Sequence, residues 1–409
     1  MASDLQFLVD QLSNRIGAAA VLEDHEQRAI VHSSQAGPID SVRRDSILHR
    51  TTSAELMTWF RSFGITTSRD IVRIPANPTL EILPRVCAPV RYRGRLLGFL
   101  WLIDAGESFS AGDLEVIQKA SEHAALLLYE DHLAERLVGQ ALSHLLSSSE
   151  ELREAAAMQL VDQALARDGE PTVVVVVQPI ADGMDLRIAI DEALFDVAWD
   201  APPGSLLRLT QADHGVLFVH LPDVSDDKAA TTLSLACRER LERRAAKELA
   251  APVRVVATLG DPQTELTKVV LSYRQARQAM KVASAIPVMG DVVRWRDLGV
   301  FRALAQLPNR EAVTSAIDPR VSTLLRSGDD ALVVTLETYL DLACDARATA
   351  AHLHLHRGTL YYRLEKAARL ASIDMGNGYD RLSVHLGLKL ARLAGQPVPG
   401  QPVRLNSDV

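Results

Sequence analysis

The stretch "LHLHRGTLYYRLEKA", residues 353–367, gathers histidine, arginine and tyrosine side chains near the end of the chain. Three kinds of chemistry suit these residue types: a metal site, a catalytic cluster, or a helix that contacts nucleic acid. His352 and His356 have the four-residue spacing of a metal pair on one continuous helix. Leu355 falls in an expected turn between them, and the sequence offers no third ligand. We therefore expect no metal site here.

Hydrophobic periodicity predicts two short helices joined by a turn, over residues 348–353 and 357–370. Ala350 faces inward on the first helix, so the second helix can cross it closely, as in a helix-turn-helix unit. Leu360 and Leu364 lie on one face of the second helix. Side chains that suit bases and phosphates occupy or flank its other face: Arg357, Gly358, Thr359, Tyr361, Tyr362, Arg363 and Glu365. A helical hairpin without DNA contacts would show the same periodicity.

The charge distribution favours DNA contact in this segment. Residues 345–396 contain eight Arg or Lys side chains and four acidic ones, a net charge of about +4. The whole chain carries −8, so the remainder holds about −12 and the protein is not a uniformly basic nucleic-acid coat. A basic module on an acidic body is typical of a DNA reader, because attraction to phosphates supplies much of the affinity.

The segment "LETYLDLACDARATAAHLHLHRGTLYYRLEKAARLASIDMGNGYDRLSVHLGLKLARL" resembles the C-terminal helix-turn-helix of the PucR/CdaR family of bacterial transcriptional regulators. The matching positions are Tyr339, Leu340, Ala350, Leu353, His356, Arg357, Thr359, Leu360, Tyr362, Arg363, Leu364, Asp380 and Arg381. The chain departs from the family at Gly358, where Asn is usual. It also has His354 where many helix-turn-helix turns have Gly. The resemblance implies binding to double-stranded DNA.

The resemblance also implies a role for each residue of the second helix. Arg357 and Thr359, near its N-terminus, are expected to grip phosphate. Tyr361 sits at the family's variable position and is our choice for base-edge contact, while Arg363 is expected to meet backbone phosphate. Tyr362 either packs beside the DNA or supports the helix. His356 and Gly358 complete the predicted DNA-binding set.

Residues 169–305 predict an α/β domain, in which "PTVVVVVQP" reads as a central strand buried on both faces. The segments "LSYRQARQAM" and "RWRDLGVFRAL" resemble the degenerate GGDEF-like middle domain of the same family. An active diguanylate cyclase needs a G-G-D-E-F turn whose carboxylates hold metal, whereas this chain has "TQADHG" at 210–215. Asp213 alone cannot hold two magnesium ions. We therefore predict a scaffold and no enzyme activity.

Residues 1–112 predict two β-hairpins and several helices, arranged as an antiparallel sheet with helices on one side. The order of these elements resembles a GAF domain, which implies a small-molecule effector or a signalling partner. Trp59, Phe63, Cys87 and Trp101 form the predicted ligand pocket. Ordinary core packing is the alternative explanation for these four side chains.

Residues 113–168 predict one or two long helices that begin at a capping signature, Ser110 with Asp113. Their apolar residues form a narrow stripe. The stripe either packs on its own domain or connects and pairs two subunits, as in a coiled coil. We favour pairing, and therefore a homodimer or higher oligomer.

Composition limits the class of protein. The chain has 409 residues and 47% hydrophobic content, enough for several packed cores. Its three cysteines are far apart and show no metal spacing, so we expect no cofactor. The longest apolar run, "LLGFLWLI" at 96–103, is too short to span a membrane, and the N-terminus lacks a secretory pattern. These features predict a cytoplasmic protein.

The sequence thus predicts a multidomain α+β regulator. A GAF-like sensor (1–112) and a long helical linker (113–168) precede a GGDEF-like α/β domain (169–305). An all-α helix-turn-helix domain (310–396) and a disordered tail (397–409) follow. Two alternatives stay open: a protein-interaction adaptor that no longer contacts DNA, and a nucleotide-binding enzyme that uses residues 169–305.

Overall fold

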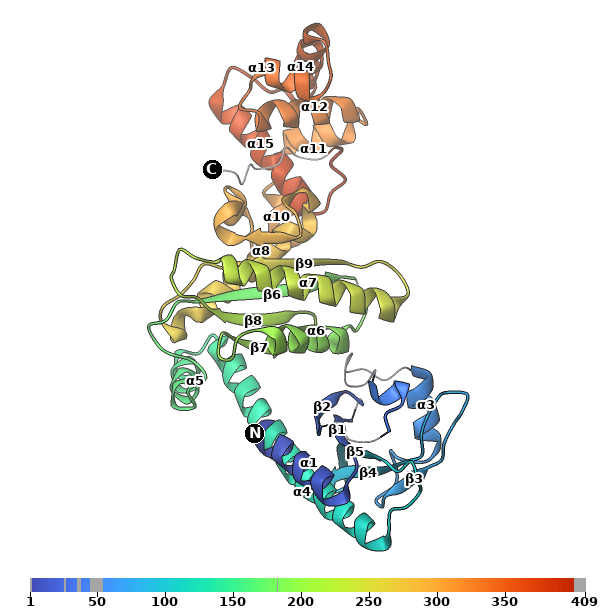
Figure 1. Cartoon of the computed structure of the whole chain (residues 1–409). Coiled ribbons are helices and arrows are strands. Elements are labelled where there is room, and N and C mark those ends of the chain that lie inside the picture. The colour runs from blue at the N-terminus through green and yellow to red at the C-terminus, as the bar shows by residue number, and fades with distance from the viewer. Residues whose placement is uncertain (1, 26, 35–37, 45–53, 182, 401–409) are drawn as a thin grey trace. The chain divides into compact units, whose positions relative to one another are not determined.

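The computed structural model describes residues 2–25, 27–34, 38–44, 54–181 and 183–400. The chain forms two compact units, residues 1–138 and 139–409 (Figure 1). Each unit has its own hydrophobic core and is described by itself. Among the described residues, no helix is long and apolar enough to cross a membrane.

The first unit is built on an antiparallel sheet with the strand order β2-β1-β5-β4-β3. Its strands are β1 (Ala20–Asp24), β2 (Ala29–His32), β3 (Val72–Ile74), β4 (Arg85–Tyr92) and β5 (Arg95–Ile103). Both predicted hairpins are confirmed, since β1 pairs with β2 and β4 pairs with β5. The second hairpin turns at Gly94, whose φ of +85° suits glycine.

Helices cover both faces of this sheet, so the prediction of helices on one side was wrong. Leu5 of α1 (Ala2–Ile16) and Ile117 of α4 (Ala111–Leu145) pack against one face. Phe60 of α3 (Ala54–Ser62) packs with Phe99 and Trp101 on the other face. Successive side chains of a strand point to opposite faces. Both faces of β4 and β5 are apolar and each needs its own cover.

The predicted long helical segment consists of two helices, α4 and α5 (Glu150–Asp162). The capping signature at its start is confirmed: the Asp113 backbone N–H donates to Ser110 Oγ at 3.2 Å, and the Ser110 N–H donates to Asp113 Oδ2 at 2.9 Å. The apolar stripe of α4 is buried at its ends but exposed in its middle. There Leu133 and Leu137 are each 43% exposed.

The sheet of the second unit has the strand order β10-β9-β6-β8-β7. Figure 1 labels its strands β9, β6, β8 and β7. The strands are β6 (Thr172–Ile180), β7 (Leu206–Thr210), β8 (Gly215–His220), β9 (Arg254–Leu259) and β10 (Val292–Arg294). The predicted central strand is confirmed as β6, in which Val173 through Val177 are buried. The pair β9–β10 is parallel, and the other three named pairs in this sheet are antiparallel.

Helices lie on both faces of this second sheet. Helices α6 (Arg187–Asp200) and α7 (Lys228–Leu249) share one apolar cluster with Val173, Val175 and Val177. Helix α8 (Val269–Ala285) contacts β6 and β9. Three short 3-10 helices frame it: η1 (Leu266–Lys268), η2 (Pro287–Met289) and η3 (Trp295–Leu298).

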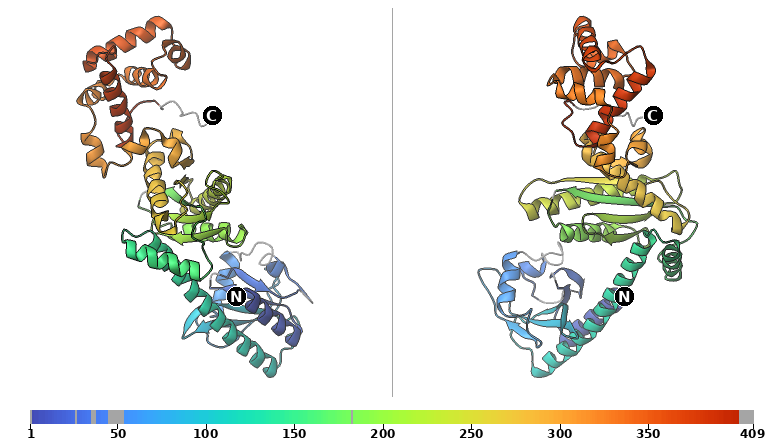
Figure 2. Two further views of the ribbon diagram at one scale, coloured as in Figure 1. Left: turned by 90° about the vertical axis from the view of Figure 1, so that its left-hand side faces the viewer. Right: turned by 180° about the vertical axis from the view of Figure 1, so that it is seen from behind.

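The C-terminal region from residue 301 to residue 393 is helical (Figure 2). Its helices are α9 (Phe301–Leu304), α10 (Arg310–Ser315), α11 (Pro319–Arg326), α12 (Asp330–Asp341), α13 (Ala346–His352), α14 (Arg357–Ala371) and α15 (Gly378–Leu393).

The start of the predicted disordered tail is held against α15. Arg392 Nη1 donates to the carbonyl oxygens of Val398 at 3.3 Å and Gly400 at 3.0 Å, and Arg392 Nη2 donates to that of Pro399 at 3.1 Å. These hydrogen bonds involve residues 398–400 only, and the disorder of the tail, residues 397–409, stays a prediction. Residues 401–409 of the predicted tail lie outside the described residues.

Candidate nucleic-acid interface

Helices α13 and α14 are joined by a tight turn over residues 353–356, where the sequence predicted it. His354 adopts a φ of +53° in this turn. Glycine enters that left-handed region without a steric penalty, and histidine does so at a modest cost. The Leu355 backbone N–H then donates to Ala350 O at 2.8 Å, which closes the turn.

Both helices begin with a side-chain cap. Asp345 Oδ1 accepts hydrogen bonds from the backbone N–H groups of Arg347 at 2.7 Å and Ala348 at 3.0 Å. These bonds hold the pKa of Asp345 below its ordinary value. His356 caps α14, where its Nδ1 accepts from the Gly358 N–H at 3.3 Å. His356 thus caps α14, whereas His352 is the last residue of α13.

The inner face of α14 fixes its position on the rest of the region. Leu360, Leu364 and Ala367 are buried, and α14 contacts α11, α12 and α13. Full burial of a leucine contributes roughly 1.5–3 kcal/mol, so these residues hold the helix in a single orientation. Ala350 of α13 is also buried, as the sequence predicted.

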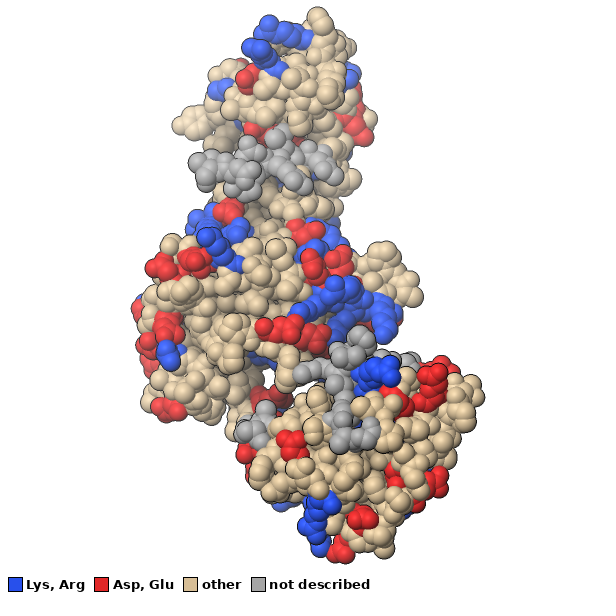
Figure 3. Space-filling view, in the orientation of Figure 1, with Lys and Arg blue, Asp and Glu red and all other residues tan. Residues whose placement is uncertain are grey.

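The outer face of α14 is open to solvent. Tyr361 is 48% exposed and Tyr362 is 60% exposed. Arg357, Gly358 and Thr359 are exposed as well. Basic side chains lie at the outer end of the C-terminal helices (Figure 3), where Figure 1 places α13 and α14. The described structure therefore brings the predicted DNA-binding side chains together on one accessible face, with the exception of Arg363.

Arg363 is half-buried and turns toward α12. Its Nη1 donates to Thr335 Oγ1 at 3.5 Å. Asp329 lies close to it: a hydrogen bond from Lys366 lowers the pKa of Asp329, and the charge of Arg363 adds to that effect. Arg363 thus supports the packing of α14 on α12, and its phosphate contact stays a prediction.

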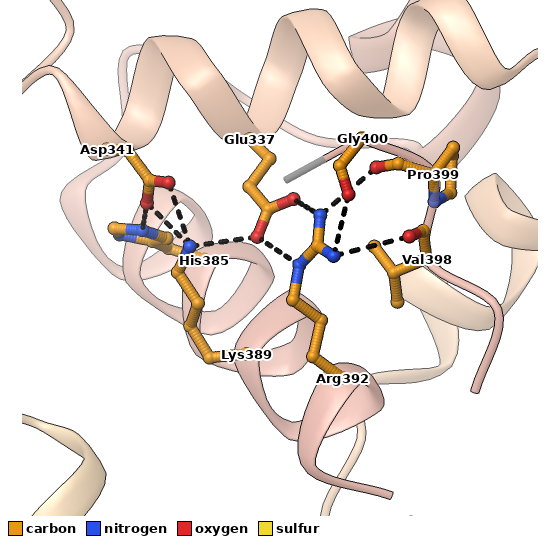
Figure 4. Close-up of polar contacts among 8 residues, drawn as sticks. All are labelled: Glu337, Asp341, His385, Lys389, Arg392, Val398, Pro399 and Gly400. Carbon is orange, nitrogen blue, oxygen red and sulfur yellow. Dashed lines mark hydrogen bonds and ion pairs between the residues drawn. The ribbon is translucent and has the colours of Figure 1, made fainter. Parts of the chain in front are cut away.

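A buried ionic network between α12 and α15 was not predicted from the sequence (Figure 4). Lys389 Nζ donates to Glu337 Oε1 at 2.8 Å and to Asp341 Oδ2 at 2.9 Å. Arg392 Nε donates to Glu337 Oε1 at 2.9 Å, and His385 Nε2 lies 2.6 Å from Asp341 Oδ1. Burial raises the pKa of Asp341, but hydrogen bonds from His385 and Lys389 and the lysine charge bring it below its ordinary value.

The network changes the charge that the region offers to DNA. Lys389 and Arg392 were two of the eight cations counted for residues 345–396, but they face Glu337 and Asp341 in the interior. Inclusion of these two acids lowers the net charge of residues 337–396 to about +2. The attraction to phosphates must therefore come from the remaining surface cations, with Arg357 on the outer face of α14.

Comparisons with known proteins agree with this geometry. The family model of the PucR C-terminal helix-turn-helix domain matches residues 332–390. The chain carries a PucR-type helix-turn-helix domain. The model of the GGDEF-like domain matches residues 144–282. The resemblances to the PucR helix-turn-helix and to the GGDEF-like domain are thereby confirmed.

Three proteins whose names describe activators or regulators are similar to this chain over most of their own length. It is 21% identical to the proline-responsive transcriptional activator PutR of Bacillus subtilis (strain 168), over 95% of this chain and 97% of PutR. It is 19% identical to the DNA-binding transcriptional activator AdeR of the same organism, over 95% of this chain and 93% of AdeR. The carbohydrate diacid regulator of Escherichia coli (strain K12) is 24% identical, over 74% of this chain and 78% of that protein.

In the GGDEF-like domain, the hairpin turn between β7 and β8 is tied to α8. His214 Nδ1 lies 2.6 Å from Asp213 Oδ1, and His214 Nε2 lies 3.0 Å from Tyr273 Oη. Arg277 Nη2 donates to Asp213 Oδ2 at 3.3 Å. The lone carboxylate of this turn is thus engaged by protein cations and donors. Among the described residues, no group of three or more His, Cys, Asp or Glu side chains could hold a metal ion.

The four predicted pocket residues of the first unit lie together in its apolar core. Trp101 and Cys87 are buried, and the ring centroids of Trp59 and Phe63 are 4.9 Å apart. Burial raises the pKa of the Cys87 thiol well above its ordinary value. Trp101 Nε1 is buried without a hydrogen-bond partner among the described residues. Core packing accounts for the other contacts, and the ligand pocket stays a prediction.

Proposed function

We propose that this PucR-type protein is a sequence-specific DNA-binding transcriptional regulator whose helix α14 lies in the major groove. The observation that carries the proposal is the two-sided character of α14, with leucines buried on one face and tyrosine and arginine exposed on the other. A major groove about 12 Å wide admits one helix, and exposed donors and rings meet base edges there. The printed names of PutR and AdeR, transcriptional activators, support the same function.

The roles of the exposed side chains divide into positioning and recognition. Arg357 and Thr359 lie in the first turn of α14, where the helix N-terminus also favours phosphate. Tyr361 lies one turn further along the exposed face and is our choice for base contact. Tyr362 is more exposed than Tyr361. We therefore expect its ring to pack beside the DNA rather than against the protein.

Substitution of Arg357 and of Tyr361 is expected to weaken operator binding in two different ways. Arg357→Ala removes a phosphate contact, so affinity should fall for all DNA sequences. The slope of log affinity against log salt concentration should become smaller in magnitude by about one. Tyr361→Ala should weaken binding to the operator by about 1–3 kcal/mol and reduce the preference of the protein for the operator sequence. Fluorescence anisotropy at several salt concentrations, on a site found by genomic footprinting, measures both effects.

Arg326→Ala is the matched control, because Arg326 is an exposed cation on α11 outside the reader helix. It should leave the salt dependence unchanged. If both α14 variants bind the operator as tightly as the unmodified chain while folding normally, the protein-interaction adaptor becomes the better account.

We further propose that the chain acts as a homodimer paired through α4, and that an effector or partner at the N-terminal GAF-like unit modulates DNA binding. The exposed leucines of α4 support the pairing, since they lie on the stripe that a two-stranded coil would bury. Two readers in one dimer would contact half-sites about 34–36 Å apart on the duplex. A small change in their spacing would then alter affinity.

Replacement of Leu133 and Leu137 by glutamate is expected to dissociate the dimer, because paired helices would bring four carboxylates into an apolar seam. Light scattering coupled to size exclusion should show the mass of one chain, and affinity for a paired operator should fall to that of one half-site. The control variant is Leu152→Glu with Met158→Glu, which places the same charges on exposed positions of α5. A variant of α4 that stays dimeric would contradict the assignment.

A further inference from the structure

A cavity of about 570 Å³ lies within the second unit, where α8 and the segment from α9 to α10 meet the C-terminal end of α15. Small-molecule pockets have volumes of about 300–1,000 Å³. Lys281 of α8 lies within the range that matches the GGDEF-like domain, and Leu393 of α15 lies three residues beyond the range that matches the helix-turn-helix domain. None of its lining residues belongs to the DNA-contacting face described above.

One part of the cavity wall is apolar. Leu304 and Val313 are buried, and Leu307 and Leu393 are half-buried. Ala305 and Ala394 leave space between these larger side chains. A hydrocarbon group of a few carbon atoms would be desolvated on this wall, at roughly 0.8 kcal/mol for each buried methylene.

The other part of the wall is positively charged. Lys281 and Arg310 both line the cavity, and none of its lining residues is acidic. Within the part of the chain that the structure describes, neither side chain makes a hydrogen bond or an ion pair. Both side chains are exposed, like Arg274 and Arg326 elsewhere in this unit, which are also unpaired among the described residues, but only Lys281 and Arg310 among these four line the cavity.

Arg310 also connects the cavity to α15. Its Nη2 lies 3.4 Å from the point where a Cβ on Gly395 would stand, so the guanidinium lies over the end of that helix. The partial negative charge of a helix C-terminus attracts this cation and accounts for part of its placement. Lys281, on α8, approaches the same cavity from the GGDEF-like domain.

We propose that this cavity binds a small carboxylate with an apolar tail, whose carboxylate faces Lys281 and Arg310 and whose tail lies on the leucine wall. The binding claim does not depend on DNA. A second claim rests on the proposed function: because the ligand contacts α8 and α15 together, its binding changes the affinity of the full chain for its operator.

Octanoate is the probe for the first claim, in calorimetric titration of the full-length protein. Octanoate should bind saturably, and octanamide, which has the same shape without the charge, should bind at least about tenfold more weakly. The variant Lys281→Gln with Arg310→Gln should also lose at least about tenfold in octanoate affinity. The control variant, Arg274→Gln with Arg326→Gln, removes two exposed cations outside the cavity and should bind as the unmodified chain does.

Several results would overturn the site: no binding of octanoate, equal binding of octanamide, or equal loss of affinity in the control variant. The second claim has a separate readout, the operator affinity with and without octanoate in the unmodified chain and in the Lys281/Arg310 variant. Octanoate that binds without a change in operator affinity overturns the coupling alone. If the chain bound no DNA at all, calorimetry would still decide the site.

Discussion

Glu337→Gln is expected to destabilise the C-terminal helices by about 3–5 kcal/mol, because it leaves two buried cations without their common carboxylate. The side chain of Glu337 is 3% exposed, and those of Lys389 and Arg392 are 8% and 10% exposed. Glutamine retains the shape but offers one oxygen and no charge. Asp341 would still face Lys389, but one amide oxygen cannot replace both carboxylate oxygens that Arg392 bonds, so Arg392 would depend mainly on the carbonyl oxygens of residues 398–400.

Hydrogen exchange read by mass spectrometry measures this loss locally, in a chain whose two units need not unfold together. Amides of α12, α14 and α15 should lose protection, while those of β6 should not. The control is Asp329→Asn, which breaks the exposed pair with Lys366 and should leave exchange unchanged. Unchanged protection of α12 and α15 in Glu337→Gln would show that the network is not needed for their packing.

Features with a local periodic signal were predictable from the sequence. The reader helix was expected over 357–370 and extends over Arg357–Ala371. Its leucines recur at the helical period. The turn before it, over residues 353–356, is formed by neighbouring residues of the sequence. The hairpins and the central strand β6 were predictable for the same reason, since alternation or a β-branched run is visible within ten residues.

The α12–α15 network was not predictable, because its partners are 52 residues apart at Glu337 and Lys389. Charged residues in a sequence are expected at the protein surface, since an unpaired lysine is rarely buried. The helix repeat of α15 offers one signal: Lys389 and Arg392 lie within a run of otherwise apolar residues. The basic residues counted toward DNA attraction therefore included two that serve the interior.

Helix placement on a sheet also depends on the whole fold. The first unit needed a helix on each face because both faces of β5 are apolar, with Phe99 on one and Leu102 on the other. A run such as "LLGFLWLI" has no polar alternation and in principle indicates burial on both sides. This run therefore indicates that a second helix, α3, must cover the other face of the sheet.

Gly260 is a further position whose importance depends on a distant contact. It directly follows the last residue of β9, and the structure sets it against α8. A Cβ there would stand 2.1 Å from the backbone oxygen of Ser272 and 2.6 Å from Ser272 Oγ. The Gly260 N–H donates to Val174 O at 3.1 Å, and Ser272 Oγ accepts from the Val174 N–H at 3.0 Å. Strands β6 and β9 and helix α8 thus meet at this residue.

Gly260→Ala is expected to destabilise the GGDEF-like domain by about 3 kcal/mol, at the upper end for overpacking, because the nearest atom is backbone and cannot rotate away. Gly139→Ala is the matched control. Gly139 lies within α4, has nothing within 4 Å of its Cβ position, and should gain about 0.5–1 kcal/mol in helix stability. Urea unfolding followed by circular dichroism should shift the midpoint down for Gly260→Ala, and no downward shift is expected for Gly139→Ala. An equal midpoint in the two variants would mean that β9 and α8 move apart readily. The close approach of Gly260 to Ser272 would then not limit stability.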